Sequence, residues 1–288
     1  MAESEGGTRR GGFAPWALMS PGLLWLFLFF LVPAYFLLRT ALSTVDFVGD
    51  TTFAWRWHNF SDAWTTNHEQ FLRSFWYGLL ATLLCIALGY PLAYVIAFRG
   101  GRWKNLLLGL VVVPFFTSYL IRTLAWKTLL QDQGPMIGFL RSVHILGSNG
   151  RLLSTPWAVV GGLTYNFLPF MILPIYVSLE KIDVNLVVAA KDLYSNAFRA
   201  FRKVVLPLSL PGVFAGSLLT FIPASGDFVN SSLLGSPRTN MIGNVVQGNF
   251  LQTVNYPSAA AISFVFMGII TLMVLVYARF LGTEGLSV

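Results

Sequence analysis

Charged residues are scarce in this sequence. Only 11% of its 288 residues are Asp, Glu, Lys or Arg, and 55% are hydrophobic. Soluble domains carry about 25% charged residues, so this chain cannot cover a water-facing surface. The composition therefore excludes a soluble domain and predicts an integral membrane protein, for which this length corresponds to one membrane domain.

Cysteine and catalytic motifs are also nearly absent. The one cysteine, Cys85, lies in an apolar run, so an intrachain disulfide is impossible and a buried packing role is predicted. The sequence has no G-x-x-x-x-G-K-[ST] phosphate loop, no HExxH or GxSxG motif and no Cys/His cluster. His58 and His68 are not accompanied by a third ligand pattern. We therefore expect no catalytic residue, no metal site and no cofactor in this chain.

Long apolar runs dominate the sequence instead. The net charge of +7 does not indicate nucleic-acid binding, because Lys and Arg alternate between loops rather than gathering on one face. A helix needs roughly 20 apolar residues to span the hydrocarbon core. We expect a polar tail (1–15), one six-helix membrane domain (16–280) and a short tail (281–288). The predicted spans are residues 16–38, 75–98, 106–129, 157–179, 205–226 and 259–279.

Two predicted spans contain residues that disturb a membrane helix. The third carries Arg122 and Lys127 in its second half, which we expect to leave the bilayer or to line a cavity. The fifth contains Pro207, Pro211 and Pro223, which should kink or break it. Backbone groups freed by such a break are tolerated at membrane depth only against protein or water.

Lys and Arg also predict the orientation. Short loops obey the positive-inside rule best, and the short segment RGGRWK (99–104) is rich in Lys and Arg. Placing this segment in the cytoplasm makes both termini cytoplasmic. It also places the loop at about 180–205, between the fourth and fifth spans, on the cytoplasmic side.

That loop continues into the stretch VVAAKDLYSNAFRAFRKVVLPLSLPG, residues 187–212. From about Asn185 to Val204, small or apolar residues recur at three- and four-residue spacing, which predicts one face of a helix. Arg199 and Arg202 belong to a polar stripe on another face. Two interpretations stay open on physical grounds: a helix lying on anionic lipid, or a docking helix for a cytoplasmic partner.

The same loop resembles the cytoplasmic EAA loop of binding-protein-dependent ABC-transporter permeases. Ala189 and Ala190 match its two alanines, and Pro207 matches the proline of its Leu-Pro end. Val188 stands where Glu is usual in the family, and Tyr194 where Gly is usual. In the family this loop forms a coupling helix that sits in a groove of the ATPase subunit. The resemblance implies ATPase coupling by Val188, Ala189, Ala190, Lys191, Asp192, Leu193, Tyr194, Ser195, Phe198, Arg199 and Pro207.

Three further segments resemble spermidine/putrescine permeases of the PotB type. They are VPFFTSYLIRTLAW (113–126), GSLLTFIPASGDFVNSSLLGSP (216–237) and MIGNVVQGNF (241–250). The resemblance covers most of the chain from about 75 to 275. It implies an all-α polytopic membrane protein with six transmembrane helices, the fold of type I (MetI-like) ABC importer permeases, and a place in a bacterial inner membrane.

The resemblance also implies partners. Such permeases pair with a second homologous permease (PotC type) and with two ATPase subunits (PotA type), which bind ATP and Mg. An extracytoplasmic polyamine-binding protein (PotD type) delivers the substrate. This chain would then be a permease surrounded by membrane lipid, and not an enzyme. The alternatives are a permease for another small solute, a self-sufficient secondary transporter, or an intramembrane enzyme, which would need clustered acids, His or a nucleophile at bilayer depth.

Asp227 is the candidate substrate contact, because it follows the proline- and glycine-containing end of the fifth predicted span. An acid within the membrane is costly and marks a functional site by default, and its carboxylate would meet an ammonium group. Nearby aromatic rings would add cation–π contacts of about 0.5–2 kcal/mol each. Alternatively, Asp227 caps the start of a helix or pairs with Arg122. The predicted substrate path comprises Asp227, Tyr119, Trp126, Tyr165, Phe228 and Asn230.

Overall fold

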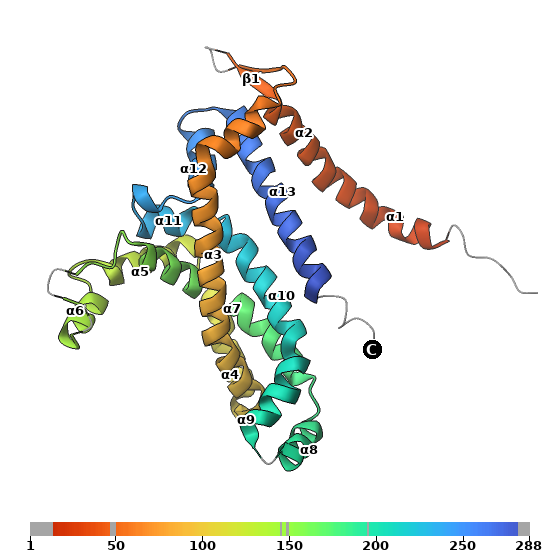
Figure 1. The fold of residues 1–288 in the computed structure, drawn as a ribbon, viewed down its shortest axis with the longest axis vertical. Helices are drawn as coiled ribbons and strands as arrows, with labels where there is room; N and C mark the ends of the chain where they lie inside the picture. Colours follow the sequence, from red (N-terminus) through yellow and green to blue (C-terminus); the bar gives the residue numbers. More distant parts are fainter. Residues whose placement is uncertain (1–13, 47–49, 145, 148–149, 195, 282–288) are drawn as a thin grey trace, which may run out of the picture.

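The computed structural model describes residues 14–46, 50–144, 146–147, 150–194 and 196–281, and helices dominate it (Figure 1). Two short antiparallel strands, β1 and β2, form a hairpin in which Thr44 lies opposite Thr52. In chain order the elements are α1 (Ala14–Leu26), η1 (Phe27–Leu31), α2 (Val32–Ala41), β1 (Ser43–Val45), β2 (Thr51–Phe53), α3 (His58–Arg99), η2 (Gly101–Trp103), α4 (Lys104–Val112), η3 (Val113–Phe116), α5 (Tyr119–Leu130), α6 (Pro135–Ser142), α7 (Pro156–Glu180), α8 (Val184–Tyr194), α9 (Ala197–Ala200), η4 (Phe201–Val205), α10 (Leu206–Ser225), α11 (Val229–Leu234), η5 (Pro237–Thr239), α12 (Ile242–Leu251) and α13 (Tyr256–Leu281).

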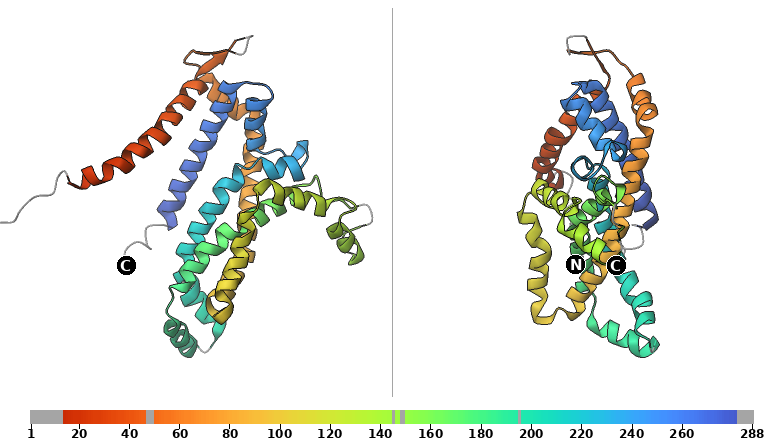
Figure 2. Two further views of the ribbon diagram at one scale, coloured as in Figure 1. Left: turned by 180° about the vertical axis from the view of Figure 1, so that it is seen from behind. Right: turned by 90° about the vertical axis from the view of Figure 1, so that its left-hand side faces the viewer.

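Helices α3, α7 and α10 pack against one another as the centre of the molecule (Figures 1 and 2). A Cβ atom added to Gly212 of α10 would come within 2.5 Å of the Pro174 carbonyl oxygen on α7, so only glycine allows this approach. The hydroxyl groups of Tyr90 on α3 and Ser209 on α10 share a buried hydrogen bond of 2.7 Å. In a lipid bilayer the hydrophobic effect does not drive helices together, because lipid tails are as apolar as the side chains. Close packing at small residues and interhelical hydrogen bonds hold the helices together instead.

Five helices of the described chain are long and apolar enough to cross a membrane, or up to six if one bent pair counts as a single span. Helices over Leu18–Ala41, Pro156–Glu180, Ala197–Ser225 and Tyr256–Arg279 coincide with predicted spans. The predicted second span, 75–98, forms only the later part of α3, which has 42 residues. Helix α3 therefore begins well before the predicted span, with a polar first part from His58 onward.

The predicted span over residues 106–129 is a bent pair of helices rather than one straight helix, and the pair together is long and apolar enough to count as one span. The chain bends by 95° between the α4–η3 helix and the α5–α6 helix. Thr117 and Ser118 adopt extended ψ angles of 146° and 138° at the break, just after Pro114. Arg122 lies on α5, beyond the bend. The charged half of the predicted span therefore runs in a different direction from the apolar half.

The proline-rich fifth span differs from its prediction in another way. Helix α10 runs without interruption from Leu206 to Ser225, with Pro211 and Pro223 inside it. The irregular turn is the π-helix η4, which ends just before Leu206 and Pro207. Proline has no N–H to donate to the carbonyl four residues back. The wider π turn lets the Leu206 N–H bond to the Phe201 carbonyl instead.

Different groups of elements mark the two ends of the molecule. Helices α8 and α9 lie at one end, near the turn between α3 and α4, and the β-hairpin lies at the other end (Figure 1). Helices α1 and α2 diverge from the central helices (Figures 1 and 2), and no residue in the most apolar window of this first span is buried. An apolar helix exposed in this way requires lipid or another subunit around it.

Candidate functional site

The predicted coupling segment forms two helices rather than one. Helix α8 ends at Tyr194 and α9 begins at Ala197, so the prediction of one helix through this segment is wrong. The Asn196 side chain accepts a hydrogen bond of 2.9 Å from the Phe198 N–H and thereby caps α9. The break between two short helices therefore forms even though Tyr194 replaces the usual glycine.

Apolar side chains of this segment face outward. Leu193 is 77% exposed, Phe198 68% and Val188 51%. Ala189, Asp192, Arg199 and Pro207 are also exposed. Ala190, Lys191 and Tyr194 belong to α8, but their side chains are outside the described part of the structure, and Ser195 lies outside the described residues altogether. The end of the molecule formed by α8 and α9 thus presents uncovered apolar residues among charged ones.

An ion pair joins the start of α4 to the end of α7 near this end of the molecule. The Lys104 Nζ atom lies 2.6 Å from Glu180 Oε1, and it also lies 5.3 Å from the centroid of the Tyr176 ring. Glu180 is the last residue of α7, just before the segment that leads into α8. The basic turn at 99–104 and the coupling segment therefore share one end of the molecule (Figure 1).

Asp227, Tyr119 and Asn230 come together although the sequence separates them widely. The Tyr119 hydroxyl donates to Asp227 Oδ2 at 2.5 Å, and the Asn230 backbone N–H donates to Asp227 Oδ1 at 2.7 Å. The Asn230 side-chain amide donates to the Tyr119 hydroxyl at 2.6 Å. Asp227 is 8% exposed and Asn230 is fully buried. The carboxylate is thus buried and fixed by two donors.

Two residues that the sequence did not single out extend this network. The Asn166 amide on α7 donates to Asn230 Oδ1 and to Thr123 Oγ1, each at 3.2 Å. Thr123 on α5 and Asn166 are both buried. Asn166 is an amide within an otherwise apolar predicted span, and a polar residue buried at such a position needs a hydrogen-bond partner. That signal was available in the sequence. We call Tyr119, Thr123, Asn166, Asp227 and Asn230 the polar network.

The structure bears on the two alternatives for Asp227. Its side chain accepts a hydrogen bond from the Asn230 N–H in the first turn of α11, as a residue that caps a helix start does. Arg122 forms no ion pair with Asp227 within the described part of the chain.

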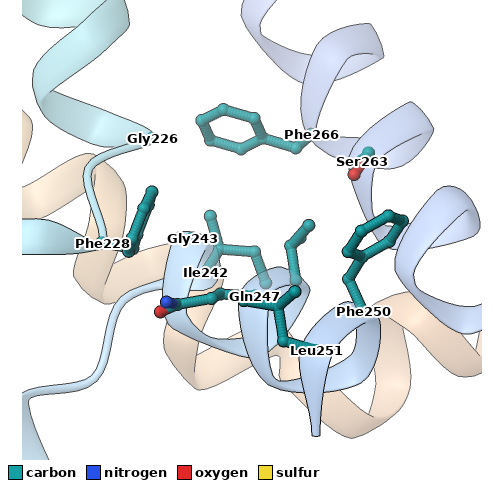
Figure 3. Close-up of a pocket in the computed structure, with 10 residues that line it drawn as sticks. Gly226, Phe228, Ile242, Gly243, Gln247, Phe250, Leu251, Ser263 and Phe266 are labelled. Atoms are coloured by element: carbon teal, nitrogen blue, oxygen red, sulfur yellow. The ribbon is translucent and has the colours of Figure 1, made fainter. Parts of the chain in front are cut away.

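The other predicted path residues lie outside the polar network. Trp126 and Tyr165 pack edge to face with ring centroids 5.4 Å apart, and Tyr165 is 36% exposed. Phe228 follows Asp227 in the chain, but it lines a separate apolar cavity of about 370 Å³ that Phe250 and Phe266 also line (Figure 3). Of the aromatic residues predicted to form the path, only Tyr119 touches the carboxylate.

Tyr119→Phe tests the polar network. The substitution keeps the ring but removes the hydroxyl that bonds both Asp227 and Asn230. Loss of a partner from a buried polar group costs about 1–3 kcal/mol, so we expect a lower thermal-unfolding temperature for the detergent-purified chain. Tyr165→Phe removes a hydroxyl from a part-exposed ring and serves as the matched control. Equal unfolding temperatures for the two variants would contradict a stabilising network.

Comparison with known proteins places the chain in a family. Residues 86–281 match the family described as "Binding-protein-dependent transport system inner membrane component". The chain is 37% identical to the spermidine/putrescine transport system permease protein PotB of Haemophilus influenzae, over 88% of this chain and 90% of that protein. It is also 37% identical to PotB of Escherichia coli K12, over 88% of this chain and 93% of that protein.

Solved structures agree on the fold. A bacterial ABC transporter involved in the import of the acidic polysaccharide alginate contains a chain that matches with a TM-score of 0.66 and 16% identity. The match covers 95% of this chain and 96% of that chain. Identity at this level supports the fold alone. The chain belongs to the binding-protein-dependent transport system inner membrane components, the permease subunits of ABC transporters.

Proposed function

We propose that this chain is a permease subunit of an ABC importer for polyamines such as spermidine and putrescine. The identity of 37% with PotB proteins, over 88% of the chain, carries the proposal. The buried carboxylate of Asp227 supports it, because an organic cation needs an anionic partner along a path through lipid. A single acid binds a polyamine weakly, which suits a subunit that must release what it admits.

The exposed apolar surfaces support an assembly with other chains. Phe116 is 86% exposed, and Ile121, across the bend on α5, is 63% exposed. A second homologous permease (PotC type) would cover this region and complete the translocation path. Two ATPase subunits (PotA type) would hydrolyse ATP with Mg, and a polyamine-binding protein (PotD type) would deliver the substrate from outside.

The end of the molecule formed by α8 and α9 is the proposed contact with the ATPase. Leu193 and Phe198 supply exposed apolar side chains there, and in protein interfaces a few residues that fill desolvated pockets carry most of the binding free energy. Helix α7 leads directly from this end to the polar network through Asn166, and Lys104 ties the last residue of α7 to α4. If the end formed by α8 and α9 lies in the cytoplasm, both termini are cytoplasmic too, as the positive-inside rule predicts.

The experiment that tests this function is uptake of radiolabelled spermidine by proteoliposomes that contain the whole transporter. The proposed second permease, ATPase and polyamine-binding protein are included. We expect uptake that requires ATP and stops when the ATPase is left out, because a secondary transporter would not need that subunit. Uptake of another solute in place of spermidine and putrescine would contradict the polyamine assignment.

Asp227→Asn belongs in the same assay. Asparagine keeps the shape and the capping oxygen but removes the negative charge, so assembly should be retained. We expect the spermidine uptake rate to fall by about tenfold or more, as loss of one charge-assisted contact of about 1.5–3 kcal/mol implies. Unchanged uptake kinetics would remove Asp227 from the path.

Leu193→Asp tests the contact with the ATPase. Placing a carboxylate at an exposed apolar position of the proposed interface should abolish co-purification of the ATPase, because the charge would be buried without a partner. Membrane insertion should stay normal. Leu251→Asp is the matched control, since Leu251 is 65% exposed but lies on α12, away from α8 and α9 (Figure 1). Normal ATPase recovery with Leu193→Asp would exclude this interface.

A further inference from the structure

Arg122 is a cation held against aromatic rings near the bend. Its Cζ atom lies 5.7 Å from the centroid of the Phe115 ring and 5.7 Å from that of the Tyr119 ring. Its Nε and Nη1 atoms are buried and have no hydrogen-bond partner among the described residues. A buried polar group without such a partner is costly. Attraction to the ring faces is the interaction that the structure offers this guanidinium.

The two rings belong to a larger aromatic group. Phe115 packs edge to face on Phe170 with centroids 4.9 Å apart, and Phe170 in turn lies 6.1 Å from Phe167. Phe167 lies 6.2 Å from Tyr119. The four rings come from η3, α5 and α7, so they meet only because the third predicted span is bent. We call Phe115, Tyr119, Phe167 and Phe170 the aromatic box.

The aromatic box has an acid on one side and open volume on another. The Tyr119 hydroxyl donates a hydrogen bond of 2.5 Å to Asp227 Oδ2, so the aromatic box lies next to the buried carboxylate. Phe170 also lines a groove of about 410 Å³ between α7 and α10, together with Val177 and Gly212. Faces of aromatic rings next to a carboxylate are the chemistry that recognises organic ammonium ions.

We propose that the aromatic box binds an ammonium group of the transported cation and that Arg122 occupies the box between transport events. The proposal rests on the proposed function in taking that cation to be the substrate. An arriving ammonium replaces the guanidinium on the ring faces, and Asp227 supplies the opposite charge. Because Arg122 is tethered beside the rings, it competes with the bound ammonium at all times. The site is therefore kept weak, so that the substrate leaves it.

The test measures how much cation the assembled permease–ATPase complex retains in detergent, with the binding protein left out. The probes are radiolabelled spermidine and radiolabelled tetramethylammonium, which has no N–H and therefore reports on ring faces. Arg122→Gln removes the competitor and should raise retention of both probes by about tenfold or more. Arg122→Lys keeps a tethered cation and should leave retention low.

The matched controls replace a phenylalanine inside the box and one outside it. In the Arg122→Gln background, Phe115→Leu should return retention to the wild-type level, whereas Phe30→Leu should not, because Phe30 is 63% exposed on η1 and lies outside the box. Raised retention of tetramethylammonium without spermidine would support the box and overturn the polyamine assignment. Unchanged retention of both probes by an intact Arg122→Gln complex would overturn the box.

If the Arg122→Gln complex does not assemble, a second pair of variants tests whether the aromatic box takes part in transport. Phe115→Leu alone, with Arg122 in place, should slow uptake by the reconstituted transporter about tenfold, while Phe30→Leu on η1 should leave uptake unchanged. Equal uptake by these two variants would overturn the proposal, since both replace one phenylalanine ring by leucine.

Discussion

A polar group removed from water needs a hydrogen-bond partner within the protein. The Asp227 carboxylate is buried and has this need, and its hydrogen bonds organise the elements around it. Its bond to the Tyr119 hydroxyl spans 108 residues of sequence. It joins the loop after α10 to the first turn of α5, and Asn230 and Asn166 carry the network on to α11 and α7. The bend in the third predicted span is stabilised by these bonds, because they hold α5 beside α11 instead of letting it continue from α4.

Helix α7 links the polar network to the proposed ATPase contact at α8 and α9. Helix α7 carries Asn166 of the polar network along its length and Glu180 at its last turn, next to the segment that forms α8. Its close contact with α10 at Gly212 leaves little freedom for the two helices to slide. A displacement of α8 and α9 by an ATPase would therefore reach the carboxylate through a packed helix rather than through a loop.

Composition and hydropathy were sufficient to predict most of the fold. Four predicted spans coincide with long apolar helices, because about 20 apolar residues have few other stable arrangements. The bend was signalled by Arg122 and Lys127, but its angle depends on contacts with α11 that local sequence cannot reveal. The helix break after Tyr194 was missed, because Asn196 supplies the cap where glycine was expected. Asn166 was missed because one amide in an apolar run is a weak signal on its own.

The fold alone does not determine what is carried. A chain of an alginate importer shares this fold at 16% identity, and alginate is an acidic polysaccharide, whereas a polyamine is a cation. On the proposed function, the difference lies in side chains such as Asp227, Arg122 and the aromatic box. The proposed substrate assignment therefore depends on the geometry at the bend.

Cysteine cross-linking tests that geometry most directly. In a Cys85→Ser background, Thr123→Cys and Asn230→Cys replace two side chains whose polar atoms lie 3.5 Å apart. Tyr90→Cys with Ser209→Cys provides a reference pair, since those hydroxyls lie 2.7 Å apart on α3 and α10. With a short thiol cross-linker in native membranes, the account predicts efficient linkage of both pairs. Linkage of the reference pair without linkage of 123 to 230 would show that α5 does not lie beside α11.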